Sequence, residues 1–407
     1  MADVTLGPNS VTRLGSVDGS LVVEGPAEIQ AEADAPIRVS ADVRLRGMVR
    51  VKGSLEARHL RVKDGTLTVE GHLTLSDGLE GDDSQVEVGG DLTAPRAEVD
   101  RRLDVGGHAR VRDLDIGGEM DVKKTVTGES VQVGGKLTVA GALDARIAEV
   151  GGSARLAQVR LDALEVGGFA EIQGGEIREK ADVGGELRTH EALRFGSLEV
   201  GGRVELGPGS SGQRIEVGGE LRALGDLTFT RLEVGGRAEL RGNGKGEQVE
   251  IGGQLKVDGS LTLSDSFEAG GDIQIAGDLS ARTIEVGGAF SARTALISGD
   301  AEFSGSVRTV HGLKARTIEI DRKCEVFGPL VGENVQLGRR SRAEAIWGDT
   351  VRLGERSEVS EVYARTVELD DACHVGKVQY TERIATGSQV VVRSPPEHVG
   401  QLPPPPL

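Results

Sequence analysis

The chain has 407 residues and carries 65 acidic against 48 basic side chains, a formal net charge of −17. This balance argues against a nucleic-acid-binding surface. The N-terminal segment has neither the basic nor the apolar region of a secretory signal, and no run reaches the roughly 18 apolar residues of a transmembrane helix. We therefore expect a cytoplasmic protein without a transmembrane segment.

The first part of the chain is only loosely periodic. Residues 1–14 are predicted to form an N-terminal tail. Residues 15–50 follow the repeat described below only approximately, so they are a candidate cap at one end of a repeat array.

From Gly89 onward, a Gly-Gly pair after an apolar residue recurs at a nearly fixed interval. The interval is 17 residues in most cases, with single values of 16 and 18 and one of 28 between Gly106 and Gly134. A short fixed period is typical of solenoids. The pair at Gly117 falls out of phase, which suggests an insertion or bulge on one turn. The first glycines of the in-phase pairs are Gly89, Gly106, Gly134, Gly151, Gly167, Gly184, Gly201, Gly218, Gly235, Gly252, Gly270 and Gly287.

Within each repeat, apolar residues alternate in steps of two, as in Ile215, Val217, Leu221 and Ala223. This is the strand period and not the helix period. We expect three short strands per turn, with glycine supplying φ > 0 at the bends. The predicted fold is all-β, a single-stranded β-helix (β-solenoid) of about 17 residues per turn, whose inward aliphatic residues stack about 4.8 Å apart and leave little room for aromatic rings.

The same phase continues after Gly287 without the Gly-Gly pair, at Ser304, Asp321, Gly338, Gly354 and Asp370. Residues 15–385 are therefore predicted to form one elongated solenoid of about 20 turns. Cys324 and Cys373 fall at an inward position three turns apart, so buried core thiols are expected, with a thiol pair or a metal site as the alternative.

One outward position is nearly always acidic. It lies two residues before the first glycine of each Gly-Gly pair, or before the equivalent residue where the pair is absent. Stacked carboxylates repel one another, and the nearby Arg282, Arg316 and Arg365, together with arginines just beyond the bend (Arg188, Arg203, Arg222 and Arg237), are expected to relieve this. Two interpretations stand: a solvated face that prevents sideways aggregation, or a stripe that binds a cation or a basic partner. The candidate ladder is Glu149, Glu165, Asp182, Glu199, Glu216, Glu233, Glu250, Glu268 and Glu285, preceded by Glu87 and Asp104 and continued at Glu319 and Glu368.

No catalytic constellation is apparent. The seven histidines are scattered without metal-ligand spacing, and neither a nucleophile elbow nor a phosphate-binding loop is present. Trp347, Tyr363 and Tyr380 are the only Trp and Tyr residues, too few for the sugar platforms of β-helical polysaccharide enzymes. We expect a non-enzymatic protein without cofactor or metal.

Residues 386–407 are predicted to form a disordered, proline-rich tail. Such a segment favours an extended polyproline-II conformation. It is either an inert solubilising end or a docking peptide for a protein partner.

The turn length, the scarcity of aromatic residues, the proline-rich tail and glycine-bounded segments such as Val69-Glu-Gly-His-Leu-Thr-Leu75 and Ile275-Ala-Gly-Asp-Leu279 resemble the bactofilins, polymer-forming cytoskeletal proteins of bacteria and some archaea. The resemblance implies a right-handed β-helix that joins end to end into filaments without nucleotide and acts as a scaffold.

This array is longer than the usual family domain. It suits a divergent member, a subunit that copolymerises with a shorter related protein, or a rod that does not polymerise. The alternative function is a β-solenoid binding rod that recognises a partner through its acidic face or its proline-rich tail.

Overall fold

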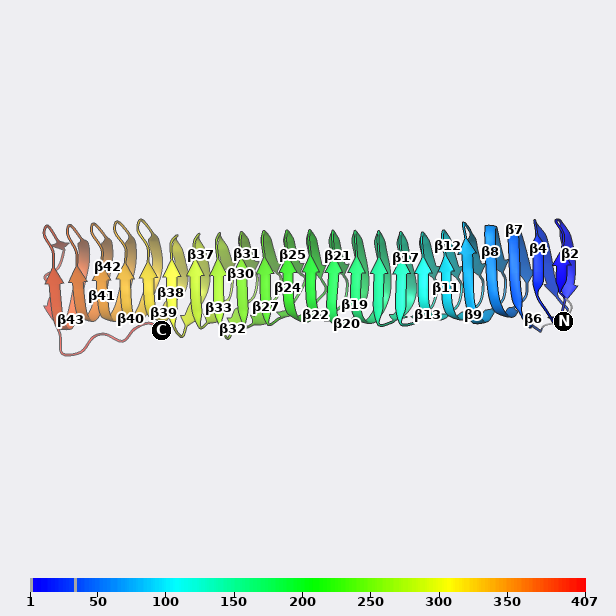
Figure 1. The fold of residues 1–407 in the computed structure, drawn as a ribbon. Helices are drawn as coiled ribbons and strands as arrows, with labels where there is room; N and C mark the ends of the chain where they lie inside the picture. Colours follow the sequence, from blue (N-terminus) through cyan, green and yellow to red (C-terminus); the bar gives the residue numbers. More distant parts are fainter. Residues whose placement is uncertain (1–2, 33–34) are drawn as a thin grey trace. The chain divides into compact units, whose positions relative to one another are not determined.

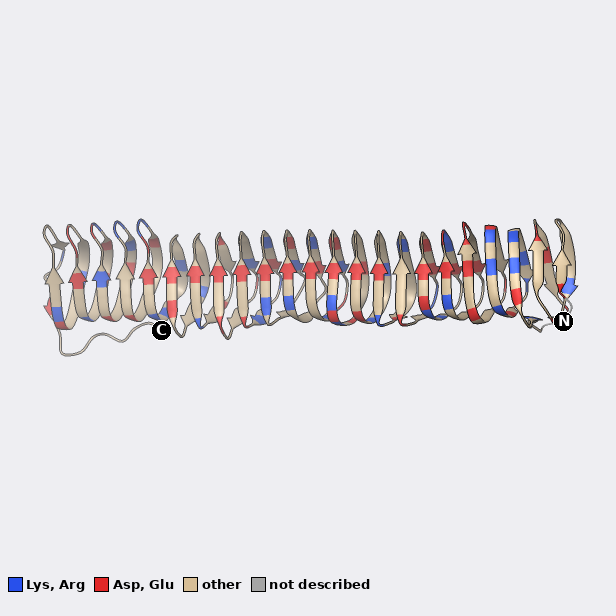
Figure 2. Cartoon of the chain, viewed as in Figure 1, with Lys and Arg blue, Asp and Glu red and all other residues tan. Residues whose placement is uncertain are grey.

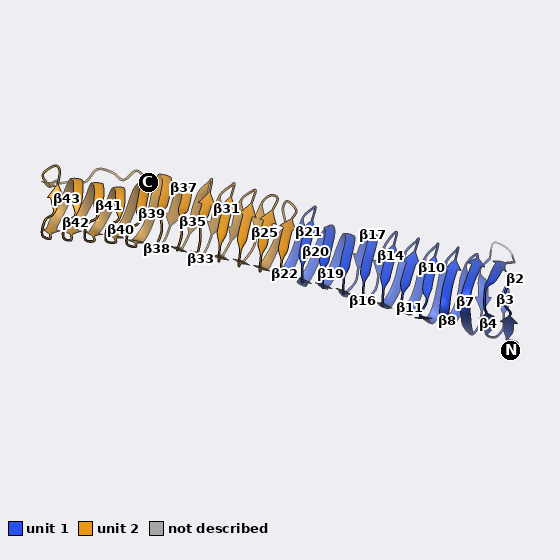
Figure 3. Ribbon diagram, turned by 90° about the horizontal axis from the view of Figure 1, so that it is seen from above, with its two compact units in different colours: residues 1–201 blue, residues 202–407 orange. Residues whose placement is uncertain are grey.

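The computed structural model describes residues 3–32 and 35–407, and in these residues it contains strands and no helix. The chain forms two compact units, residues 1–201 and 202–407 (Figure 3). Each unit is a stack of solenoid turns whose strands pair in parallel with those of the next turn (Figure 1). Together the two units contain about 23 turns. The prediction of an all-β solenoid with about 17 residues per turn is confirmed, with somewhat more turns than expected.

The strands of the first unit are β1 (Val4–Leu6), β2 (Ser10–Leu14), β3 (Ser16–Val17), β4 (Leu21–Glu24), β5 (Ala27–Ala31), β6 (Ile37–Val39), β7 (Asp42–Lys52), β8 (Leu55–Val69), β9 (Leu73–Asp82), β10 (Gln85–Val88), β11 (Leu92–Val99), β12 (Arg102–Val105), β13 (Ala109–Ile116), β14 (Glu119–Val122), β15 (Val126–Thr127), β16 (Ser130–Val133), β17 (Lys136–Asp144), β18 (Ile147–Val150), β19 (Ser153–Val166), β20 (Phe169–Val183), β21 (Glu186–Thr189) and β22 (Leu193–Val200).

The strands of the second unit are β23 (Arg203–Leu206), β24 (Ser211–Val217), β25 (Glu220–Ala223), β26 (Leu227–Thr228), β27 (Arg231–Val234), β28 (Arg237–Leu240), β29 (Gly244–Gly246), β30 (Gln248–Ile251), β31 (Gln254–Val257), β32 (Leu261–Leu263), β33 (Ser266–Ala269), β34 (Ile273–Ile275), β35 (Asp278–Ala281), β36 (Thr283–Val286), β37 (Phe290–Ile297), β38 (Asp300–Phe303), β39 (Val307–Ile320), β40 (Glu325–Leu337), β41 (Arg342–Leu353), β42 (Glu358–Leu369), β43 (His374–Thr386), β44 (Val391–Val392) and β45 (Glu397–His398).

The solenoid begins earlier than the sequence suggested. β1 pairs in parallel with β4, and β2 pairs with β5, in both cases one regular repeat further along the chain. The prediction of a tail over residues 1–14 is therefore wrong from Val4 onward. The following step, from Leu21 to Val43, is longer than the regular repeat, and the additional residues lie between β5 and β6. This one long connection explains why residues 15–50 seem only loosely periodic.

The phase break at Gly117 is not an insertion. Val99 pairs with Ile116 and Ile116 with Val133, while Leu103 pairs with Met120 and Met120 with Leu137, so both ladders advance by the regular repeat. The Gly-Gly pair instead moves from the corner after β12 to the corner after β13, within the same turn. The prediction of an inserted segment or a bulge is corrected accordingly.

The recurring glycines are required by close approach of the turns and not by backbone conformation. In the described residues the glycines with positive φ are Gly25, Gly47, Gly53, Gly175, Gly209, Gly312 and Gly328, none of which belongs to the recurring pairs. A Cβ on Gly151 would lie 2.3 Å from the carbonyl oxygen of Gly134, and one on Gly252 would lie 2.5 Å from that of Gly235. The backbone of each corner therefore occupies the space that a side chain on the next corner needs.

The interior of each unit is a column of buried Val, Leu, Ile and Ala side chains. It also contains rings, contrary to the expectation of an aliphatic lumen: Phe290 and Phe303 are fully buried with ring centroids 5.3 Å apart. Phe229 fits because its neighbour in the stack is Gly246, where a Cβ would lie 2.2 Å from the ring. A glycine in the adjacent turn therefore makes room for the ring of Phe229, whereas Phe290 and Phe303 pack between larger aliphatic neighbours.

The last turns of the second unit keep the regular repeat length, but their corners no longer contain a Gly-Gly pair. Val286, Phe303, Ile320, Leu337, Leu353 and Leu369 pair successively, as the sequence predicted. From Lys323 onward the corner contains a non-glycine residue with φ between 56° and 62°, at Lys323, Arg340, Arg356, Ala372 and Gln389. Cys324 and Cys373 follow such residues and are buried free thiols, which confirms their predicted inward position.

The proline-rich tail is ordered at its start. Val391–Val392 pairs with His374–Val375, and Glu397–His398 pairs with Gln379–Tyr380. The prediction of a tail from residue 386 is corrected: residues 391–398 form a partial turn on β43, and only the segment after Val399 has no strand.

We predict that Gly151→Ala destabilises the fold by about 1–3 kcal/mol, because its Cβ overlaps a backbone oxygen that can move only with a whole turn. The matched control is Gly7→Ala, since no heavy atom lies within 4 Å of the added Cβ. Thermal unfolding of the two variants measures the difference. Equal melting temperatures would contradict the role assigned to the stacked glycines.

Candidate interaction surfaces

The predicted carboxylates lie in register on successive turns of each unit. In the first unit Glu149, Glu165, Asp182 and Glu199 are direct neighbours in the parallel ladder. In the second unit the ladder residues are Glu216, Glu233, Glu250, Glu268 and Glu285, and it continues through Glu302 and Glu319. Figure 2 shows acidic residues recurring at one place on successive turns. Neighbouring turns hold these half-buried or exposed side chains at the parallel-strand spacing of about 4.8 Å.

Two of the predicted members belong elsewhere. Glu87 pairs with Asp104, and Asp104 pairs with Asp121. These residues form a separate column that runs through β10, β12 and β14. The sequence grouped them with the ladder because the Gly-Gly marker moves from one corner to the other. Glu368, also predicted, does lie in the ladder column, where its neighbour Arg352 binds it at 2.7 Å.

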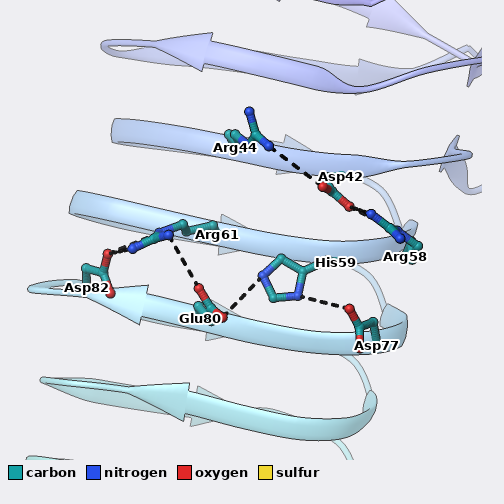
Figure 4. Close-up of polar contacts among 8 residues, drawn as sticks. All are labelled: Asp42, Arg44, Arg58, His59, Arg61, Asp77, Glu80 and Asp82. Carbon is teal, nitrogen blue, oxygen red and sulfur yellow. Dashed lines mark hydrogen bonds and ion pairs between the residues drawn. The ribbon is translucent and has the colours of Figure 1, made fainter. Parts of the chain in front are cut away.

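Toward the N-terminus the ladder column changes sign. Arg44, Arg61, Glu80 and Glu98 are successive neighbours in it. Arg61 binds Asp82 at 2.6 Å and lies 3.7 Å from Glu80 (Figure 4). The column therefore begins with the uncharged Thr5 and Val22, continues with two arginines, and has its first carboxylate at Glu80.

His59 lies beside the start of this column. Its ring nitrogens are 3.8 Å from Asp77 and 3.7 Å from Glu80, and in the preceding turn Asp42 contacts Arg58 at 2.8 Å and Arg44 at 3.8 Å (Figure 4). These are exposed or half-buried ion pairs, each of which contributes little to stability. The cluster places carboxylates beside arginines and a histidine on neighbouring turns.

The cations that relieve the ladder lie two residues before its carboxylates on the same strand. Lys180 binds Asp182 at 3.1 Å and Glu199 at 2.8 Å. In the second unit Arg231 lies 3.5 Å from Glu233 and 3.2 Å from Glu250, and Arg214 lies 3.5 Å from Glu216. Lys180 and Arg231 therefore each contact the carboxylates of two successive turns.

The arginines predicted for this role have other partners. Arg282 binds Asp265 at 2.5 Å, Arg316 binds Asp300 at 3.0 Å and Arg365 binds Glu382 at 2.5 Å. Of the arginines beyond the bend, Arg203 binds Glu220 at 3.0 Å, Arg222 contacts Glu239 at 3.4 Å, Arg188 binds Glu186 at 3.0 Å and Arg237 donates to Gln254 at 2.8 Å. The hydrogen bond from Arg316 lowers the pKa of Asp300. Hydrogen bonds from Gln248 and then from Arg282 lower the pKa of Asp265.

Part of the ladder has no counter-charge. Across residues 3–32 and 35–407, no cation lies within ion-pair distance of Glu165, Glu268, Glu285, Glu302 or Glu319. Four of these five are consecutive in the second unit. The expectation of an arginine-compensated face therefore holds only for part of the column.

Within the described residues, no group of three or more His, Cys, Asp or Glu side chains is placed to hold a metal ion. Burial raises the pKa of both Cys324 and Cys373, which disfavours the reactive thiolate. No helix that is long and apolar enough to cross a membrane occurs in the part of the chain that is described.

The second surface is an apolar groove on the C-terminal turns, which the sequence analysis did not identify. Trp347 and Tyr363 are in register on β41 and β42, and their rings stack with centroids 4.9 Å apart at 25°. Tyr380 lies in the next turn and meets the His398 ring edge-on at 5.4 Å. The signal was present in the sequence, because each of these aromatic residues follows the previous one by the length of a single turn.

Tyr363 is held in a buried, hydrogen-bonded state. Its side chain is 6% exposed, and its hydroxyl donates to Glu361 at 2.8 Å. Burial first, and then the hydrogen bond and charge of Glu361, raise the pKa of Tyr363 to about 12. Lys377 lies over the ring, 5.4 Å from its centroid.

No family model, no curated protein and no solved structure matches this chain.

We predict that Glu285→Gln increases the free energy of unfolding by about a few tenths of a kcal/mol at low salt and so raises the melting temperature slightly. Its neighbours Glu268 and Glu302 are both acidic, so the substitution removes repulsion. Glu250→Gln is the control. It also loses the ion pair with Arg231, so its melting temperature should rise less than that of Glu285→Gln. Salt screens both effects. A decrease for Glu285→Gln at low salt would contradict unrelieved repulsion.

We predict that Tyr363 ionises near pH 12 in the folded protein and near pH 10 once unfolded. Because folding raises this pKa, the stabilisation by the neutral phenol is complete below about pH 10 and is lost as the pH rises through about 12. The Tyr380→Phe variant leaves Tyr363 as the only tyrosine, so tyrosinate absorbance reports it alone. A folded-state midpoint near pH 10 would show that the ring is solvated.

Proposed function

We propose that this protein is a non-enzymatic scaffold protein that self-associates end to end, without nucleotide, through the first turn of its solenoid. The observation that carries the proposal is the difference between its two terminal turns. The physical basis is that an unpaired parallel strand edge presents free N–H and C=O groups, which must be capped or paired.

The first turn has such an edge. β1, β2 and β3 pair with β4, β5 and β6, and among the described residues no strand pairs with their outer side. The side chains of Val4 and Leu6 are only half-buried there, whereas their partners in the next turn, Leu21 and Val23, are fully buried. A second copy added at this edge would bury these side chains.

The last turn is closed differently. Against the 13 residues of β43, the partial turn supplies two strands of two residues each, β44 and β45. Pro395 and Pro396 lie between them, and proline has no N–H to donate to a further strand. Association through the first turn alone joins the same surface of two copies, which closes at a pair.

The resemblance to the bactofilins supports the same class of function. Right-handed winding is taken from this resemblance, and three strands per turn and a cytoplasmic location are expected from the sequence; all three are part of the proposal. Long filaments would also require the last turn as a joint, with displacement of its proline-containing partial turn.

A second candidate function is recognition of a basic partner by the second unit. The observation favouring it is the run of carboxylates without counter-ions from Glu268 to Glu319. It is distinguished from self-association by its response to salt, since the contact would be screened, whereas strand pairing at the first turn would persist.

We predict that Thr5→Pro abolishes self-association. Val4 donates its N–H to Ser20 at 2.9 Å, and because successive peptide groups of a strand point to opposite edges, the N–H of Thr5 points outward. Proline removes that donor and leaves the pairing within the chain intact. Thr5→Val, which keeps the N–H, is the matched control.

Sedimentation velocity over a range of protein concentration is the measurement. We expect the wild type and Thr5→Val to associate and Thr5→Pro to remain monomeric with an unchanged melting temperature. A wild-type protein that stays monomeric throughout, or a Thr5→Pro variant that associates equally, would refute the proposal.

A further inference from the structure

The C-terminal turns of the second unit present an apolar column on their outer surface. Leu296, Lys314, Val331, Trp347 and Tyr363 follow one another in register on β37, β39, β40, β41 and β42. Four of these five residues are apolar or aromatic, although the position faces outward. Elsewhere in this unit the same column contains small polar residues, for example Thr262 and Ser280.

The chain's own C-terminal segment lies along this column. After β45 the chain returns past β42, β41 and β40 and ends beside β39 (Figure 1). Residues 401–405 form one wall of a cavity of about 960 Å³ whose other walls include Leu296, Val331, Trp347 and Tyr363. The side chains of Leu402, Pro403 and Leu407 are half-buried.

The segment is anchored at both ends. At its start, Val399 donates its N–H to Tyr380 at 2.9 Å, and Gln379 donates to Glu397 at 2.7 Å. At its end, the Cδ1 atom of Leu407 lies 2.7 Å from the position that a Cβ on Gly312 would take. Gly312, with φ of +131°, thus leaves a notch that Leu407 fills.

The chemistry of the groove matches a polyproline segment. Four consecutive prolines, residues 403–406, have no N–H and cannot extend the sheet, but they favour the polyproline-II helix, whose carbonyl groups stay free to accept. Such helices dock into aromatic-lined grooves. The indole Nε1 of Trp347 is buried and has no acceptor among the described residues, residues 401–407 included, so the segment contacts this ring by apolar packing and not through that donor.

We propose that this groove is a polyproline-recognition site and that its occupant is residues 401–407 of the same chain. The residues just before the segment are already bound to β43, which gives the segment a high effective concentration at the groove. The tail is therefore a bound intramolecular ligand and not a free docking peptide. Its presence shields the single tryptophan and closes the groove to other proline-rich segments.

Trp347 is the only tryptophan of the chain, so its fluorescence reports the groove directly. In the full-length protein we expect Leu402→Glu to shift the emission to longer wavelength and to increase quenching by acrylamide. Pro406→Glu is the matched control, because Pro406 is exposed and does not line the groove, and it should match the wild type. Equal quenching in the wild type and Leu402→Glu would overturn the proposal.

A variant ending at Gly400 tests recognition itself. The removed residues form no strand, so its melting temperature should stay close to that of the wild type, and its Trp347 should be quenched more. Adding the peptide Gln-Leu-Pro-Pro-Pro-Pro-Leu should restore protection in a saturable manner, whereas the same peptide with Leu replaced by Glu at its second position should not. Failure of the peptide to restore protection would overturn recognition of the segment.

The concentration dependence identifies the source of the bound segment. Protection of Trp347 in the wild type should be the same at all protein concentrations, including those at which the protein is monomeric. Protection that disappears on dilution would mean that a second copy supplies the segment and would overturn the intramolecular assignment. The Leu402→Glu variant should associate as the wild type does, so this result is independent of the joint proposed at Thr5.

Discussion

The axial spacing of the turns, about 4.8 Å in a parallel sheet, is the constraint on which the structure of each unit depends. It places every residue directly against the residue one turn before and one turn after it. At the corners this leaves no room for a Cβ: one placed on Gly151 would lie 2.3 Å from the carbonyl oxygen of Gly134. In the interior it requires that Phe229 have a glycine beside it. Sequence periodicity is the consequence of this contact between equivalent positions.

The same spacing determines the outer surfaces. A residue type that recurs at one outward position becomes a continuous column, so a small bias in sequence produces a carboxylate ladder in one place and an aromatic groove in another. The ladder is relieved where Lys180 or Arg231 bridges two turns and is left uncompensated from Glu268 to Glu319. In the C-terminal turns the column that includes Trp347 and Tyr363 is apolar, and the chain covers it with its own proline-rich segment.

Much of the fold was predictable from the sequence, because period-two alternation and the regular interval between Gly-Gly pairs are local signals. The sequence-based assignments are wrong where the Gly-Gly pair does not stay at one corner of the turn. The Gly-Gly pair changes corner near Gly117, so Glu87 and Asp104 were assigned to the wrong column. The first turn was missed because the long connection between β5 and β6 shifts its phase, and β1 has no glycine pair.

The surfaces were less predictable than the fold. The register of Glu149 to Glu285 followed from the period, but the ion pairs did not: Arg282 is close to the ladder in sequence, yet the structure places it against Asp265. The aromatic groove could have been found from the spacing of Trp347 and Tyr363, which are one turn apart. Its occupant could not, since nothing in the periodic signal places residues 401–407 against turns that lie much earlier in the sequence.

The central claim is that the two ends of the solenoid differ, one being a joint and the other closed. Negative-stain electron microscopy of the untagged protein, without nucleotide and over a range of concentration, tests it most directly. We expect single particles at low concentration and particles made of two chains at high concentration, with no further growth. Single particles at every concentration would contradict the joint at the first turn, and long filaments would contradict closure of the last.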